Sequence, residues 1–161
     1  MKMIALFAAT QAIMPAGPKP SVDEIAAAFQ HFCVGTEGDR GRFDALVESM
    51  PALQKTSQPS LFSGVEFNRR WALGSIEIAF LDVPPPNRRQ CSASGRGSFG
   101  EADVARIVSG LSGSSDMHLV TQVPGYMAWS GTTASGATVA LNFRTTPGGT
   151  GDFSMSLLPT P

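Results

Sequence analysis

The glycine-rich stretch 95–100 carries the clearest ligand-binding pattern in the sequence. It reads Gly-Arg-Gly-Ser-Phe-Gly and matches the GxGxxG spacing of dinucleotide-binding loops, whose glycines let a pyrophosphate approach the start of a helix. The context argues against a dinucleotide, because no strand–helix–strand unit surrounds the motif and no strand ending in Asp or Glu follows at the usual distance. We therefore expect no cofactor. A weaker anion site at the start of the following helix would use Arg96, Gly97 and Ser98.

The sequence contains histidines, serines and carboxylates, the residue types of a hydrolytic site, but they do not occur at the spacing of a known catalytic motif. Nucleophilic catalysis needs a nucleophile, a base and an orienting group, and the sequence has no Gly-x-Ser-x-Gly elbow. His31 and His118 are the only histidines, and we expect both to be packing or surface residues. Glu66, Glu77 and Asp82 fall on neighbouring predicted strands, where their alternation is typical of a solvent-facing side. The sequence therefore predicts no catalytic residue.

Two pairs of arginines, Arg69-Arg70 and Arg88-Arg89, would bring four cations together if their strands pair. Such a cluster could bind an acidic ligand, although a solvated rim is the interpretation that we favour. Nucleic acid is not an expected partner, because 12 Lys and Arg residues against 13 Asp and Glu residues give a net charge of −1.

The two cysteines, Cys33 and Cys91, allow one intramolecular disulfide. The alternative is two separate buried thiols. A metal site is not expected, because zinc prefers four ligands at short paired spacings and only His31 and His118 are available beside the cysteines. The Cys-x-x-Cys spacing of redox-active pairs is also missing.

Residues 1–17 have the order basic, apolar and small that is typical of a secretory signal peptide. Lys2 precedes the apolar stretch 3–9, which is too short to span a membrane. Cleavage could follow Ala12 or Ala16. We therefore expect a periplasmic or secreted protein, and no later segment is apolar enough to give the mature chain an integral membrane span.

The remaining residues, 18–161, have the length of one domain and are expected to form a single α+β domain. Hydrophobic residues make up 42% of the chain and charged residues only 16%, which excludes a disordered charged tail. The 17 glycines and 12 prolines favour a fold with many turns.

The first helix is predicted over residues 19–35. Ser21 and Glu24 form a capping-box pattern, in which each side chain bonds the backbone N–H of the other residue. Apolar residues then recur at three- and four-residue steps and place Cys33 on the buried face, before Gly35 ends the helix.

Two further helices are predicted. One opens at Asp39 and ends at Pro51, and the other follows a second capping-box pattern formed by Ser98 and Glu101. The stretch 52–63 is polar and reads as a loop.

Seven short apolar or alternating stretches predict strands that are joined by tight turns. Short connections favour antiparallel pairing, so the sequence predicts a curved antiparallel sheet with two N-terminal helices and one mid-chain helix packed on one face. The predicted strands cover residues 65–73, 76–83, 89–94, 117–123, 126–130, 137–144 and 153–157.

Several of these residues together resemble a family of uncharacterised small exported bacterial envelope proteins. The similarity lies in Phe29-x-x-x-Cys33-Val34, in Trp71 and in Cys91 followed by Ser-Ala and a helix. The resemblance implies a disulfide between Cys33 and Cys91 and an envelope location, and it supplies no catalytic residues. We therefore expect a non-catalytic binding or accessory module whose partner is an envelope component or a small ligand. The alternative is a small secreted hydrolase with a Ser/His or carboxylate site.

Overall fold

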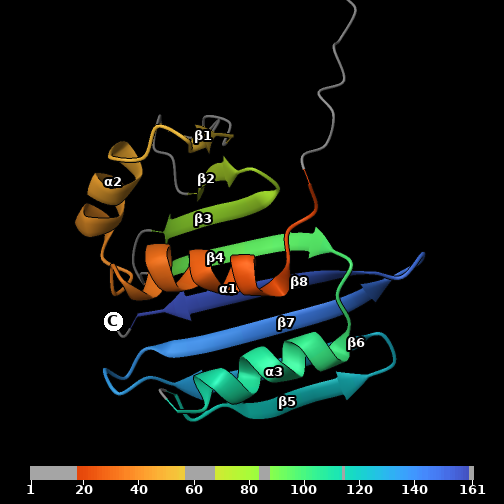
Figure 1. Ribbon diagram of the computed structural model, residues 1–161. Coiled ribbons are helices and arrows are strands. Elements are labelled where there is room, and N and C mark those ends of the chain that lie inside the picture. The colour runs from red at the N-terminus through yellow and green to blue at the C-terminus, as the bar shows by residue number, and fades with distance from the viewer. Residues whose placement is uncertain (1–17, 57–67, 84–87, 114, 160–161) are drawn as a thin grey trace, which may run out of the picture.

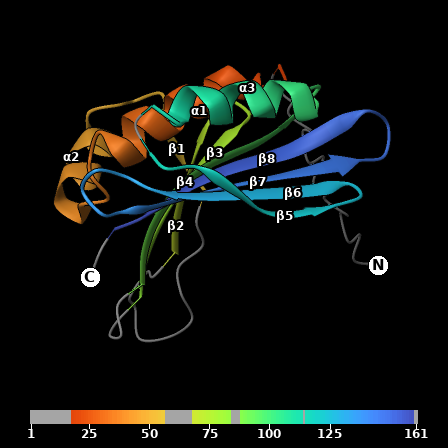
Figure 2. The same ribbon diagram turned by 90° about the horizontal axis from the view of Figure 1, so that it is seen from below.

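The computed structural model describes residues 18–56, 68–83, 88–113 and 115–159 and has the predicted α+β architecture (Figure 1). The helices lie together on one face of a twisted, open antiparallel sheet (Figure 2). They are α1 (Val22–Phe29), which continues as the π-helical turn η1 (Gln30–Val34), α2 (Arg40–Glu48) and α3 (Glu101–Leu111). The strands are β1 (Gln54–Lys55), β2 (Asn68–Leu73), β3 (Ile76–Val83), β4 (Arg88–Gly97), β5 (His118–Val123), β6 (Tyr126–Thr132), β7 (Thr138–Thr146) and β8 (Thr150–Leu158).

Helix α1 begins with the predicted capping box. The Ser21 N–H donates to Glu24 Oε2 at 2.7 Å, and the Glu24 N–H donates to Ser21 Oγ at 3.2 Å. The helix continues into η1, where the Gly35 N–H bonds the Gln30 carbonyl at 2.8 Å and closes a wider turn. The residues of this turn include Cys33, which is fully buried against the sheet.

The Cys33–Cys91 disulfide is confirmed, with a Cα–Cα distance of 5.3 Å. It ties η1 to the middle of β4 and closes a loop of 58 residues, which the chain-entropy account values at about 4 kcal/mol. Structural disulfides form outside the reducing cytoplasm, so the bridge indicates a non-cytoplasmic compartment. None of the helices in the described ranges is long and apolar enough to cross a membrane.

The strand order β1-β2-β3-β4-β8-β7-β6-β5 divides the molecule into two halves of the same plan. In the N-terminal half, residues 18–97, helices precede the meander β1 to β4. In the C-terminal half, residues 98–159, α3 precedes the meander β5 to β8. The last strands of the two meanders, β4 and β8, pair antiparallel at the centre of the sheet. Strand β1 lies within the stretch predicted as a loop.

One row of paired residues crosses the sheet on the side of the helices and shows the correspondence between the halves. Each half contributes a buried tryptophan from its second strand, and the row between the two tryptophans is apolar. The row reads Trp71, Ile78, Ala93, Met155, Leu141 and Trp129.

The predicted start of the mid-chain helix at Ser98 is wrong. Strand β4 continues to Gly97, and the N-cap of α3 is Gly100, two residues later than the predicted cap at Ser98. The Gly100 N–H donates to Asp103 Oδ2 at 3.0 Å. The intervening Phe99 is buried against the rings of Phe143 and Phe153, and this packing requires an extended chain where the sequence predicts a capped turn.

Candidate ligand-binding site on the open face of the sheet

The face of the sheet turned away from the helices, here called the open face, carries small and polar side chains. Side chains alternate along a strand, so the neighbours of the buried row point to this side. Within the described ranges no helix covers it (Figure 2). One row across its centre reads Glu77, Ser94, Ser154, Asn142 and Ala128. A second row, toward one end of the strands, reads Arg96, Asp152, Arg144 and Tyr126.

A pocket of about 450 Å³ lies over these two rows. The small side chains of the central row leave room between the longer polar residues around it. Its lining residues are Ser75, Glu77, Ser94, Gly95, Arg96, Tyr126, Asn142, Phe143, Arg144, Asp152, Phe153 and Ser154. The pocket therefore draws on strands of both halves and depends on the pairing of β4 with β8.

Arg96 and Asp152 form a bidentate ion pair along one wall of the pocket. Arg96 Nε donates to Asp152 Oδ1 at 2.5 Å, and its Nη2 donates to Oδ2 at 3.0 Å. This hydrogen bonding lowers the pKa of Asp152 below its ordinary value, with a smaller electrostatic contribution from Arg144. The same contact raises the pKa of Arg96. Arg96 thus already has an anionic partner within the protein.

Tyr126, Asn142 and Arg144 continue the lining of the pocket on β6 and β7, with Arg144 directly beside Asp152 in the second row. The Tyr126 hydroxyl donates to Asn142 Oδ1 at 2.7 Å, which leaves the amide nitrogen of Asn142 as a donor for a ligand. The guanidinium of Arg144 lies 6.0 Å from the centre of the Tyr126 ring. Arg144 is exposed and forms no ion pair with any other described residue. It is therefore the cation of the pocket that is best placed to meet a ligand.

The structure separates the three residues predicted as an anion site. Arg96 points to the open face, Gly97 is buried on the helix side, and Ser98 is exposed after the end of β4. A Cβ at Gly97 would collide with the Pro20 carbonyl oxygen and the Phe99 ring. Glycine at this position therefore permits close packing of the strand end, and the three residues do not converge on one site.

The two pairs of arginines are also separated, because neighbouring residues of a strand face opposite sides. Arg70 lies on the open face beside Glu77, at 3.4 Å, whereas Arg69 lies on the helix side. Arg89 approaches Asp82 at 3.6 Å. The side chain of Arg88 lies outside the described part of the chain, as does Glu66.

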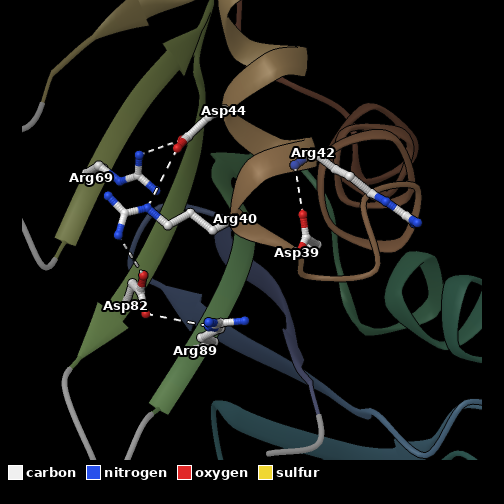
Figure 3. Close-up of polar contacts among 7 residues, drawn as sticks. All are labelled: Asp39, Arg40, Arg42, Asp44, Arg69, Asp82 and Arg89. Carbon is white, nitrogen blue, oxygen red and sulfur yellow. Dashed lines mark hydrogen bonds and ion pairs between the residues drawn. The ribbon is translucent and has the colours of Figure 1, made fainter.

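Arg69, Arg40 and Arg89 alternate with two aspartates in an ion-pair network under α2 (Figure 3). Asp44 receives Arg69 Nη1 at 2.5 Å and Arg40 Nε at 3.7 Å. Asp82 receives Arg40 Nη1 at 3.1 Å. Because each aspartate lies between two arginines, the network fixes α2 to β2 and β3.

The histidines do not meet a nucleophile in the described part of the chain. His118 lies at the start of the edge strand β5, where its Nδ1 is 3.4 Å from the Asp116 carbonyl oxygen. His31 lies on η1 and packs edge-on against Phe32. No hydrogen bond among the described residues joins either imidazole to a serine hydroxyl or a carboxylate, and these residues contain no group of side chains able to hold a metal ion.

Comparison with known protein families, with curated proteins and with solved structures finds no match to this chain.

The pocket escaped prediction because it depends on strand order. Asn142, Tyr126 and Arg144 come together with Arg96 only when β8 pairs with β4, and nothing in the local sequence specifies that pairing. The local signals were Arg96, which the glycine motif singled out for a different reason, and Glu77, which stood out only as one of three strand carboxylates.

Proposed function

We propose that this chain is an exported, non-catalytic binding or accessory module of the bacterial cell envelope, and that the open face of its sheet is the binding surface. The observation that carries the proposal is the pocket of about 450 Å³ on that face. Its volume falls in the usual range of small-molecule sites, and polar groups converge on it from strands of both halves.

The chemistry of the pocket favours a polar partner of small net charge. Arg96 and Arg144 are balanced by Glu77 and Asp152, so a highly charged ligand would meet as much repulsion as attraction. Asn142 and the serines Ser94 and Ser154 provide short hydrogen-bonding groups along the floor. A small ligand or an exposed part of an envelope component that carries hydroxyl and amide groups fits this surface.

Export to the periplasm or the medium is part of the proposal. The disulfide supports it, because that bond would not persist in a reducing compartment. Residues 1–17 provide the signal peptide in this account, and the resemblance to uncharacterised small exported proteins is consistent with it. Mass spectrometry of the protein from separated cell fractions, without reductant, tests this part. Full-length protein with two free thiols in the cytosol would refute export.

Binding is tested by co-sedimentation of the purified protein with isolated cell envelopes. Wild-type protein should sediment with the envelopes, and Arg144→Ala should weaken the association, since Arg144 is an exposed cation of the pocket and, unlike Arg96, forms no ion pair with another described residue. Arg42→Ala is the matched control, because Arg42 is an exposed arginine of α2 on the other side of the sheet. Equal sedimentation of all three proteins, or no sedimentation of the wild type, would contradict the binding proposal.

A separate assay tests the alternative of a hydrolase. Hydrolysis of a p-nitrophenyl ester that is blocked by a serine-directed phosphonate would support a hydrolase instead of a binding module.

A further inference from the structure

The exposed apolar side chains of the molecule concentrate on one edge of the sheet. Leu119, Val120 and Val123 are 45%, 58% and 51% exposed, and all three belong to β5. Among the described residues no other large apolar side chain is as exposed. Strand β5 is the last in the sheet order, so its outer backbone edge has no strand beside it in the described part of the chain.

The opposite edge of the sheet is built differently. Strand β1 has only two residues, Gln54 and Lys55, both polar and exposed. Short and charged edge strands are a common protection against pairing with another chain. Strand β5 has six residues and none of them is charged or proline, although a bulge between Leu119 and Thr121 interrupts its regular pairing.

The apolar surface of β5 continues on both sides of the sheet. On the helix side, Leu119 lies opposite the buried Trp129, and the half-buried side chains of Met117 and Met127 adjoin the core there. On the open face, Val123 lies opposite Tyr126. A strand added beside β5 would therefore cover apolar side chains on both faces as well as satisfy backbone groups at the edge.

We propose that β5 pairs with the β5 strand of a second copy of this chain, antiparallel and around a twofold axis, so that two copies share one continuous sheet. The absence of charge on β5 supports a second copy as the occupant, because two identical strands without charges meet without repulsion. The net charge of −1 for the whole chain adds no barrier to self-association.

The geometry of an antiparallel pair also suits this strand. His118 is at one end of β5, so twofold symmetry places the two imidazoles at opposite ends of the interface. The chain already contains an antiparallel strand pair that joins two halves, since β4 and β8 pair and unite the two helix-and-meander halves in one sheet. In the proposed dimer, β5, the first strand of the C-terminal meander, pairs antiparallel with β5 of the second copy in the same manner.

Sedimentation equilibrium over a wide range of protein concentration measures the association. Wild-type protein should be dimeric at high concentration, and Leu119→Lys and Val123→Lys should each raise the dissociation constant by about 10–100-fold, because each replaces a buried apolar contact by a charge. Gln54→Lys is the matched control on the other edge and should leave the dimer unchanged. Wild-type protein that remains monomeric at every concentration would overturn the proposal, as would a dimer that only Gln54→Lys dissociates.

A cysteine introduced on β5 tests the pairing without adding a charge. The described residues contain no free cysteine, so Val120→Cys would provide a single reactive thiol. Mild oxidation should link two copies of this variant covalently, and Gln54→Cys under the same conditions should remain monomeric. Failure of Val120→Cys to link while Gln54→Cys links would assign the interface to β1 instead. Because the substituted side chains are exposed, circular dichroism should show the same fold for all variants.

Discussion

The N-terminal and C-terminal halves share one plan but are stabilised differently. The N-terminal half contains the Cys33–Cys91 disulfide, the additional helix α2 and an ion-pair network that fixes this helix to the sheet. In the described residues of the C-terminal half there is no disulfide, and no ion pair joins two of its own residues. That half is packed mainly by apolar side chains, among them the rings of Phe99, Phe143 and Phe153.

The two meanders also differ in how the apolar side chains of their outer strands are covered. Helix α2 places Phe43 on the outer strands of the N-terminal half, where the Phe43 ring lies 5.3 Å from Trp71 and 4.7 Å from Phe80. The described residues of the C-terminal half form no second helix, and the outer strand of that half keeps apolar side chains exposed. The N-terminal half, which contains the disulfide and the ion-pair network, ends in the short polar edge strand β1. The C-terminal half ends in the edge strand β5, which exposes apolar side chains.

The largest expected effect comes from removing the contact between α2 and the sheet. Phe43 is fully buried, so Phe43→Ala should lower the free energy of unfolding by about 3–5 kcal/mol, through lost burial and the cavity left behind. Denaturant unfolding measures the loss. Glu48→Ala, an exposed position of the same helix, should change the free energy of unfolding by less than about 0.5 kcal/mol.

Amide hydrogen exchange on Phe43→Ala locates the loss of stability. Exchange should accelerate in α2, β1 and β2, while the amides of β6 and β7 keep most of their protection, because the Phe43 ring packs against Phe32, Trp71 and Phe80 of the N-terminal half. Equal acceleration of exchange in β6 and β7 would mean that α2 stabilises both halves alike, which would contradict the proposed difference between them.

Reduction of the disulfide should have the next largest effect. Breaking the bridge should lower the free energy of unfolding by about 2–5 kcal/mol, since the loop of 58 residues becomes free in the unfolded chain. The measurement compares thermal unfolding with and without reductant. A double variant, Cys33→Ala with Cys91→Ala, is the control and should not respond to reductant. An identical unfolding midpoint for the oxidised and reduced wild type would show that the bridge contributes nothing to the N-terminal half.

Much of the fold could be predicted because local signals agree with tertiary packing. The capping box of Ser21 and Glu24 starts α1 as expected, and the apolar spacing after it places Cys33 toward the sheet. Alternating apolar residues predicted most strands for the same reason. Where the prediction of the helix start failed, at Ser98, the burial of Phe99 outweighed a local capping pattern.

The rest depended on long-range pairing that the local sequence does not encode. Strand β1 has two polar residues and therefore no hydrophobic period. The two halves have no repeated sequence motif, and their correspondence becomes visible only when Trp71 and Trp129 fall in one row of the sheet. The pocket on the open face likewise exists only through the pairing of β4 with β8.

The smallest expected effect concerns the two exposed ion pairs that join the halves. Arg96 bonds Asp152 across the β4–β8 pair, and Arg106 of α3 bonds Asp23 of α1 at 2.7 Å. In each pair the arginine hydrogen bond lowers the pKa of the aspartate below its ordinary value of 3.8. A lowered pKa means that the folded state favours the charged carboxylate. The stabilisation is therefore complete above about pH 4, the ordinary range of an aspartate, and it is lost as the pH falls through the pKa of the folded state.

Nuclear magnetic resonance titration of the aspartate carboxyl carbons tests each of the two ion pairs separately. Arg96→Gln should raise the pKa of Asp152 toward 3.8 and leave that of Asp23 unchanged, because Asp23 has Arg106 as its own partner. The change in stability at neutral pH should be small, since both pairs are exposed to solvent. A pKa of Asp152 that does not move in Arg96→Gln would show that this ion pair does not form in solution. The halves would then be joined at that point by the backbone pairing of β4 and β8 alone.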